Sequence, residues 1–276
     1  MDLDALQLAI LLILAEFTVG SLVAVLVMDA RNAVPASFVK LSSGIVVVGA
    51  ALTALAAFNA DSAQLQDYRL QDGLFGPVRG TYLAFVALTL PYAWVTLRGR
   101  REASLRWGAV ASAAGVVGLG MLAYQVSLPT WGFAGVFISL LAGSLALGLV
   151  SESMIMGHWY LVRPKLPGRP LQELTLLLFA VLVIQAVLII VNASIPAREV
   201  PESTAALAGG LASNPAFWLR VGVGMVFPLA LAYMAWQSSK EHAMMSATGL
   251  LYIAVGAVFV GEVLARGLLF VTASPV

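Results

Sequence analysis

An ionisable side chain inside a long apolar run is the first residue of this sequence that could do chemistry. Glu16 lies midway along the run from 5 to 28, with Gly20 one turn later on the same helical face. A charge at the centre of a membrane helix costs at least about 2.5 kcal/mol and normally faces the interior of the helix bundle. We therefore interpret Glu16 as a proton-handling carboxyl or a hydrogen-bond partner of a quinone or substrate, with a protonated structural hydrogen bond as the alternative.

Three further charges lie in the last two apolar runs. Glu262 and Arg266 are four residues apart, so they share one helical face, and Arg220 falls near the start of the preceding run. One ion-paired network could join all three. Such a network is either a structural clamp or a site for an anion or a lipid head group.

The stretch from 152 to 165 is the most distinctive of the chain, because an apolar run gives way there to polar and aromatic residues. Tryptophan and tyrosine rings are typical of the membrane boundary, and basic side chains follow them at the head groups. The candidates that we take from it for a quinone or proton role are Glu152, His158, Trp159, Tyr160 and Arg163.

Both histidines of the chain, His158 and His242, are expected at the same face of the membrane. Two histidines from different helices are the minimum needed to hold a haem iron axially, and they could instead bind a quinone oxygen or relay protons. We prefer the quinone or proton role and keep a haem b ligated by this pair as the alternative.

The elements that must position these residues are long apolar helices. Hydrophobic residues make up 61% of the 276 residues, charged residues make up 11%, and the mean hydropathy is +0.94. A membrane-spanning helix needs about 20 apolar residues. The sequence contains eight such runs, at about 5–28, 41–57, 81–97, 107–126, 131–150, 174–191, 216–236 and 243–271. We predict an all-α polytopic integral membrane protein, with 1–276 as a single membrane domain in contact with the lipid bilayer.

The positions of the basic residues predict the orientation, because lysine and arginine are retained in cytoplasmic loops. Ten of them fall on one side: Arg31, Lys40, Arg98, Arg100, Arg101, Arg106, Arg163, Lys165, Arg169 and Lys240. The opposite side holds three, together with five acids: Arg69, Arg79, Arg198, Asp61, Asp67, Asp72, Glu199 and Glu202. We therefore expect a protein of the inner (cytoplasmic) membrane with both termini on the non-cytoplasmic side.

A faint internal repetition suggests two halves of four helices, 1–128 and 129–276. The first and fifth runs each contain a Gly-Ser pair, at Gly20 and Gly143, and an acid nine residues after the glycine, at Asp29 and Glu152. Since four is even, the halves would point the same way across the membrane. The alternative is a chance match among small apolar residues.

The chain contains no cysteine, which removes iron–sulfur ligation and thiol catalysis from its own chemistry. It also lacks the common nucleotide-binding, metalloprotease and hydrolase motifs. A formal net charge of +1 without a basic tail gives no reason to expect nucleic acid.

This layout of eight helices, external termini, two halves and short loops resembles the NrfD, PsrC and DmsC type of quinone-reactive membrane anchor. The local sequence similarity is the Gly-x-x-x-Ala pattern formed by Gly20 and Ala24 in the first run. Such anchors often carry a histidine at the end of the second helix, where this chain reads Phe58-Asn59-Ala60-Asp61-Ser62, so no site residue is transferred. The resemblance implies electron exchange between quinol and partner subunits that bear metal clusters. A small transporter or a purely structural assembly subunit are the competing classes.

Overall fold

The computed structural model describes residues 3–60, 65, 68–163, 166–198 and 211–276. Several charges used above to predict the orientation, namely Asp61, Asp67, Lys165, Glu199 and Glu202, lie outside these residues.

Eight spans long and apolar enough to cross a membrane account for almost all of the described chain. The helices are α1 (Leu3–Ala30), α2 (Ala36–Asn59), α3 (Phe75–Leu97), α4 (Arg101–Val126), α5 (Phe133–Val162), α6 (Arg169–Ser194), α7 (Pro215–Val221), α8 (Phe227–Lys240) and α9 (Met244–Thr272). A π-helical segment, η5 (Gly222–Val226), joins α7 to α8 into one span, and two short 3-10 turns, η2 (Asp72–Leu74) and η4 (Leu211–Ser213), lie in the connections. The prediction of an all-α polytopic membrane protein is confirmed.

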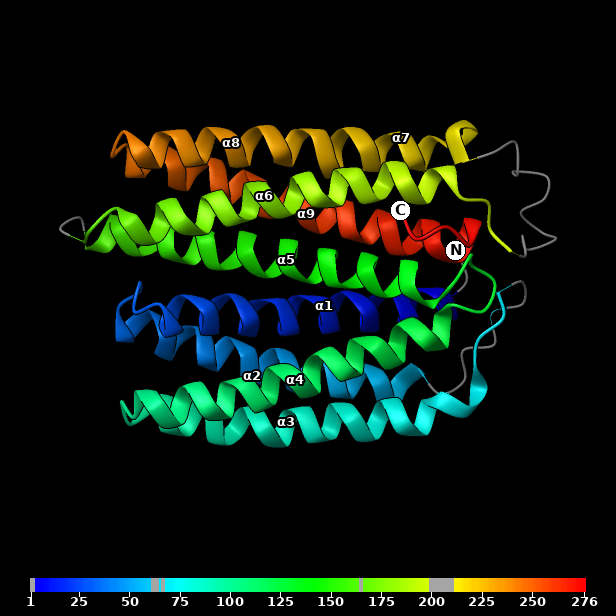
Figure 1. Cartoon of the computed structure of the whole chain (residues 1–276), viewed down its shortest axis with the longest axis horizontal. Coiled ribbons are helices and arrows are strands. Elements are labelled where there is room, and N and C mark those ends of the chain that lie inside the picture. The colour runs from blue at the N-terminus through cyan, green and yellow to red at the C-terminus, as the bar shows by residue number, and fades with distance from the viewer. Residues whose placement is uncertain (1–2, 61–64, 66–67, 164–165, 199–210) are drawn as a thin grey trace.

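The helices form two neighbouring groups that lie side by side along the long axis of the molecule (Figure 1). In the first group α1, α2, α3 and α4 contact one another in chain order, and α4 closes back on α1. In the second group α5, α6, the α7–η5–α8 span and α9 are arranged in the same order, and α9 closes back on α5. This order of neighbours is what two related halves would give; the repeat itself stays a prediction.

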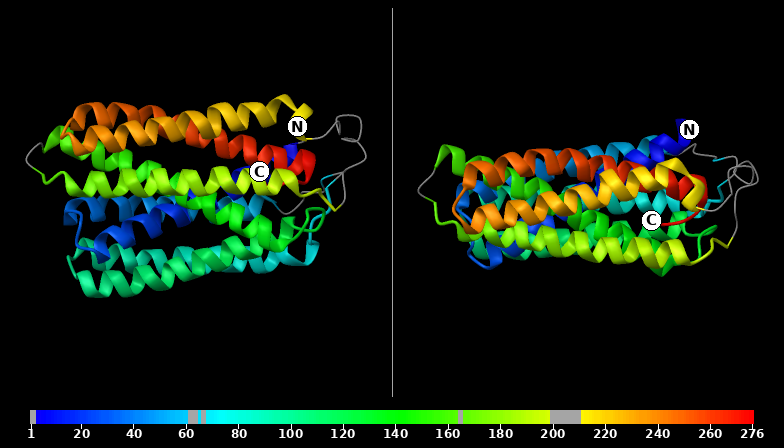
Figure 2. Two further views of the ribbon diagram at one scale, coloured as in Figure 1. Left: turned by 45° about the horizontal axis from the view of Figure 1, so that its top comes forward. Right: turned by 90° about the horizontal axis from the view of Figure 1, so that it is seen from above.

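Helices α1 and α5 join the two groups at the centre of the molecule (Figures 1 and 2), and they run in the same direction. A Cβ atom added to Gly20 would lie 1.7 Å from the backbone oxygen of Ser144, and one added to Gly148 would lie 2.1 Å from the carbonyl carbon of Gly20. No side chain fits at either position. Small residues let membrane helices approach closely, so the two backbones touch here.

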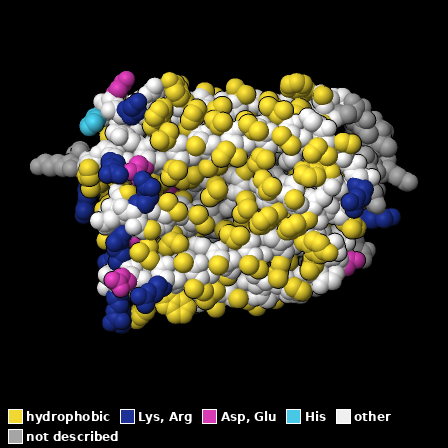
Figure 3. All heavy atoms as spheres, in the orientation of Figure 1, with side chains coloured by type: hydrophobic (Ala, Val, Ile, Leu, Met, Phe, Trp, Pro, Cys, Tyr) yellow, Lys and Arg dark blue, Asp and Glu magenta, His cyan; other side chains and the backbone are white. Residues whose placement is uncertain are grey.

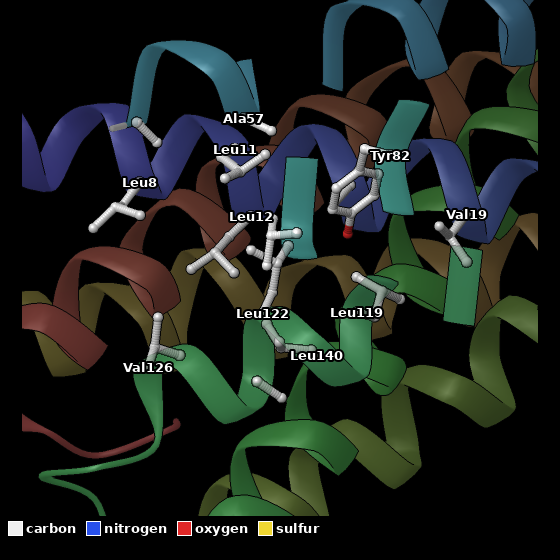
Figure 4. Packing of buried hydrophobic residues seen from close by; sticks show 14 of the residues in the cluster. Leu8, Leu11, Leu12, Val19, Ala57, Tyr82, Leu119, Leu122, Val126 and Leu140 are labelled. Carbon is white, nitrogen blue, oxygen red and sulfur yellow. The ribbon is translucent and has the colours of Figure 1, made fainter. Parts of the chain in front are cut away.

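Two large apolar cores fill the bundle, and each also takes residues from the other group, such as Leu140 and Leu269 in the first and Val25 and Phe38 in the second. Figure 4 shows part of the first, in which Leu8, Leu11, Leu12 and Leu122 pack together with Tyr82. The second core is built mainly from α5, α6, α8 and α9. The outer surface is also apolar over most of its length, as expected for a protein whose solvent is lipid (Figure 3).

Lysine and arginine side chains gather at one end of the bundle (Figure 3), where the α1–α2, α3–α4, α5–α6 and α8–α9 connections lie. We call this the basic end. The opposite end holds the two chain termini (Figure 1).

The seventh span departs from α-helical geometry just before Pro228, whereas the third span stays α-helical around Pro91. Pro91 lies inside the α-helix α3. Before Pro228 the helix widens, and the N–H of Phe227 bonds to the oxygen of Gly222, five residues back. Because proline has no N–H, Pro228 also leaves the carbonyl of Gly224, one turn earlier, without its usual helical donor.

Candidate functional site: a buried ionic network

Two glutamates and two arginines meet inside the bundle. Arg266 lies between two carboxylates: its Nη2 is 2.7 Å from Oε1 of Glu16 and donates to Oε2 of Glu262 at 3.0 Å, while its Nε donates to Oε2 of Glu16 at 3.1 Å. Arg220 Nη2 donates to Oε1 of Glu262 at 3.2 Å. We call these four residues the ionic network. Their charges balance.

The network connects three elements that are distant in the sequence. Glu16 comes from α1, Arg220 from α7, and Glu262 and Arg266 from successive turns of α9. The sequence predicted the last three as a group and Glu16 as a separate site; the structure joins all four. Glu16 reaches the others because α1 packs against α9 as well as α5.

All four side chains are at most 1% exposed. Moving one ion from water into a low-dielectric interior costs several kcal/mol even after relaxation, and the cost is offset only when partners are well placed. The balanced charges of the network meet that condition. Removal of a single member would leave an uncompensated charge.

A glycine of α5 makes the room for this arrangement. A Cβ atom added to Gly143 would lie 2.6 Å from Glu262 Oε2, 2.8 Å from Glu16 Oε1 and 2.9 Å from Arg266 Nη2. The charged groups therefore pack directly on the backbone of α5. The sequence indicated Gly143 as a member of the predicted repeat, but not its contact with charged groups.

Two polar groups outside the network complete it. The side-chain amide of Gln185 in α6 donates to Glu262 Oε1. Arg220 Nη1 donates at 3.0 Å to the oxygen of Gly224, the carbonyl that Pro228 leaves without a helical donor. The π-helical segment thus supplies an acceptor for a buried guanidinium. Sequence analysis overlooked Gln185, although it interrupts the apolar run from 174 to 191.

Some polar atoms of the site have no hydrogen-bond partner among the described residues. They are Arg220 Nε, Arg266 Nη1, Gln185 Oε1 and the hydroxyl of Tyr82. Glu16 Oε1 is within ion-pair distance of Arg266 but is not aligned with it as a hydrogen bond. Buried polar groups are normally paired. The arginine N–H groups and the Tyr82 hydroxyl can donate to water or to the oxygen of a small molecule, and the two side-chain oxygens can accept from water or a hydroxyl.

Glu152 forms a second buried carboxyl site, nearer the basic end. Its side chain is fully buried in α5, and Oε2 accepts a hydrogen bond of 2.7 Å from the hydroxyl of Ser42 in α2. Among the described residues neither Oε1 nor the hydroxyl of the adjacent Ser153 has a hydrogen-bond partner. Within the described part of the chain Glu152 forms no ion pair.

The two carboxyl sites lie at different depths along the same pair of helices. Gly143 contacts Glu16, and Glu152 follows nine residues later on α5, or about 14 Å at roughly 1.5 Å per residue. The buried hydroxyls of Ser21 and Ser144 lie in the α1–α5 contact between them. We call Glu16, Ser21, Ser144 and Glu152 the polar line.

The two histidines lie near the ends of their helices, and each has its own partner. His158 is exposed, and its Nδ1 is 2.9 Å from the hydroxyl of Tyr252 in α9. His242 is exposed in the α8–α9 turn with φ 62°, and its Nδ1 is 3.1 Å from the oxygen of Lys240. The structure does not join them through a shared contact, so the haem hypothesis gains no support from their partners.

The other candidates from the 152–165 stretch lie at the end of α5. Trp159 is half-buried, and Arg163 is exposed as the residue that ends the helix. Tyr160 is buried and donates its hydroxyl proton to the oxygen of Pro167. Tyr160 also lines a pocket of about 230 Å³ at the basic end, between the α1–α2 and α5–α6 connections.

Two comparisons with known proteins bear on the interpretation. No protein-family model matches the chain, and no curated protein matches it.

Proposed function

We propose that this chain is an integral membrane subunit of an electron-transfer complex, in which it moves protons for quinone chemistry. The multi-pass bundle buries ionisable side chains, and the chain has no cysteine with which to hold a cluster of its own. Electrons would then come from partner subunits, and the bundle would supply the proton path and the membrane anchor.

The observation that carries the proposal is Glu152, a fully buried carboxyl without a cation. An ionised carboxylate in that position costs several kcal/mol, so the protonated form is favoured at rest. A carboxyl that is neutral at rest and charged only briefly is suited to passing a proton. The hydroxyls of Ser21 and Ser144 extend this route toward the ionic network.

The ionic network would serve the reactive end of the path. Arg220 Nε and Arg266 Nη1 are buried donors without partners, and guanidinium groups stabilise negative charge on oxygen. A quinone that gains an electron develops such charge. We propose that a quinone oxygen approaches these donors while Glu16 exchanges the proton.

The orientation and the membrane belong to the same proposal. The basic end would face the cytoplasm, and both termini would lie on the opposite side of the inner membrane. Protons would then travel between the cytoplasmic half, where Glu152 lies, and the outer half, where the ionic network lies.

The test uses the complex purified with its native partners. Quinol oxidation is measured together with proton release or uptake for the wild type, Glu152→Gln and, as a surface control, the exposed Glu241→Gln. We expect Glu152→Gln to lower proton-coupled turnover about tenfold or more and Glu241→Gln to leave it unchanged. Normal turnover of Glu152→Gln would overturn the proton role.

A transporter is the second candidate, and the π-helical segment beside Arg220 favours it, because such segments recur at functional sites. The chain alone in liposomes should then catalyse solute uptake. Co-purification with haem or iron–sulfur subunits supports the first proposal. A partnered complex indifferent to Glu16→Gln and His158→Gln would instead indicate a structural assembly subunit.

A further inference from the structure

The turn between α3 and α4 at the basic end carries an unusual concentration of arginine. Arg100, Arg101 and Arg106 line an open pocket of about 470 Å³ together with Glu102 and Trp107. Arg98, two residues before Arg100, lies over the ring of Trp94 with its guanidinium carbon 4.3 Å from the ring centroid. We call Arg98, Arg100, Arg101 and Arg106 the arginine turn.

Two of these four arginines have no ion pair with a described residue. Arg101 is occupied, because it donates to Asp29 Oδ1 at 3.1 Å and to the backbone at the end of α1. The acid that lines the pocket is Glu102. Its side chain is 92% exposed, and its ion pair with Arg106 is long, at 3.9 Å. Arg98 and Arg100 form no ion pair with any described residue.

In the other connections at the basic end, acidic side chains lie next to basic ones. Glu173 pairs with both Arg31, at 3.1 Å, and Arg169, at 2.7 Å. The α8–α9 turn has Lys240 over the ring of Trp236, in the same relation as Arg98 over Trp94, but Glu241 follows directly. The arginine turn is distinguished by Arg98 and Arg100, which lie two residues apart and form no ion pair with a described residue.

Exposed apolar side chains continue from this pocket along α3 and α4. Trp94 is 57%, Leu97 56% and Val110 52% exposed, and Trp107 lies on the rim of the pocket itself. A ligand here meets guanidinium groups at one end and an apolar helix surface at the other. That combination suits an anion attached to hydrocarbon chains.

We propose that the arginine turn binds the phosphate head group of an anionic phospholipid. Arg100 and Arg106 contact the phosphate, the indole of Trp107 lies at the level of the ester groups, and the acyl chains follow Leu97 and Val110. Arg101 holds the turn in place through its ion pair with Asp29 and does not contact the phosphate. This site is separate from the polar line and does not depend on the proposed proton path.

The experiment measures lipid binding to the purified chain by native mass spectrometry, with phosphatidylglycerol and phosphatidylcholine as probes. A basic residue near an anionic head group strengthens binding by about fivefold. The double variant Arg100→Gln/Arg106→Gln should therefore bind phosphatidylglycerol about 25-fold more weakly, with phosphatidylcholine binding unchanged. The matched control Lys240→Gln, at the same end and beside its own tryptophan, should change either affinity less than twofold.

Three results would overturn the proposal. Wild-type affinity of the double variant would exclude the site, and an equal effect of Lys240→Gln would show only a general surface attraction. Inorganic pyrophosphate binding as tightly as phosphatidylglycerol, with the same loss in the double variant, would assign the pocket to a soluble phosphate instead. An unchanged elution volume and melting temperature of each variant establish that it is folded.

Discussion

The ionic network and the Glu152 site bury the same functional group in the same bundle by different means. Glu16 pairs with Arg266, whereas Glu262 pairs with both Arg220 and Arg266 and accepts a further hydrogen bond from Gln185. Glu152 accepts one hydrogen bond, from the hydroxyl of Ser42. Each carboxylate of the network thus has a cation, whereas one oxygen of Glu152 has neither a hydrogen bond nor an ion pair with a described residue.

This difference predicts that the two sites respond differently to substitution. The ionic network fastens α1, α7 and α9 to one another, so loss of a member should affect the fold. Glu152 contributes one hydrogen bond between α2 and α5, so its loss should affect function more than folding.

The largest loss of stability is expected from Arg266→Gln, which tests whether the ionic network stabilises the fold. This change removes the cation from Glu16 and one of the two from Glu262, and loss of one partner of a buried pair costs about 3–5 kcal/mol. We expect a large fall in melting temperature in detergent. The double variant Glu16→Gln/Arg266→Gln should recover part of it, because no orphaned carboxylate remains at position 16. Equal losses in the single and double variants would contradict the pairing.

The next effect is expected from Gly143→Ala. Its new methyl group would lie within 3 Å of three charged atoms, and forcing extra volume into a packed site costs about 1–3 kcal/mol. Chemical denaturation in mixed micelles measures the change. Gly256→Ala is the matched control, because Gly256 lies on an exposed part of α9 with open space around it. A loss of stability in the control as large as that of Gly143→Ala would show that glycine flexibility, not packing, is responsible.

Glu152→Gln should cost less than about 1 kcal/mol of stability, since the amide oxygen can still accept the hydrogen bond from Ser42. The same substitution at Glu16 removes a charge that Arg266 needs and should cost more. Melting temperatures of the two variants in one detergent give the comparison directly. If both fall equally, the two sites do not differ in the way described.

The smallest effect concerns the π-helical segment. Pro228→Ala adds an N–H donor that competes with Arg220 for the oxygen of Gly224, and we expect a change of about 0.5–1 kcal/mol. A double-mutant cycle with Arg220→Gln measures the coupling. Strictly additive effects would mean that the proline and the arginine act independently.

The apolar runs of the sequence predicted the spans well, because a bilayer demands long apolar helices and little else. The predicted spans differ from the observed helices mainly at their ends. The third span was expected to begin near 81, yet α3 begins at Phe75. Gly76 and Pro77 look like loop residues, but proline is tolerated in the first helical turn, where no backbone donor is lost.

The site was predictable only where its members are close in sequence. The spacing of Glu262 and Arg266 follows from helix geometry, whereas the contact of Glu16 with Arg266 requires α1 to pack against α9, 250 residues away. The π-helical segment was also not foreseen, because nothing in the residues around Pro228 indicates that the carbonyl of Gly224 accepts a hydrogen bond from Arg220. Gln185 showed a signal, a polar residue within an apolar run, that was not used.

The backbone contact of α1 with α5 at Gly20 and Gly148 has a mechanical consequence. A rocking motion of one helix group against the other would have to separate two helices in direct contact and also pull Glu16 away from Arg266. We therefore expect the two groups to move as one frame, in which any moving part is a side chain, a proton or a bound molecule.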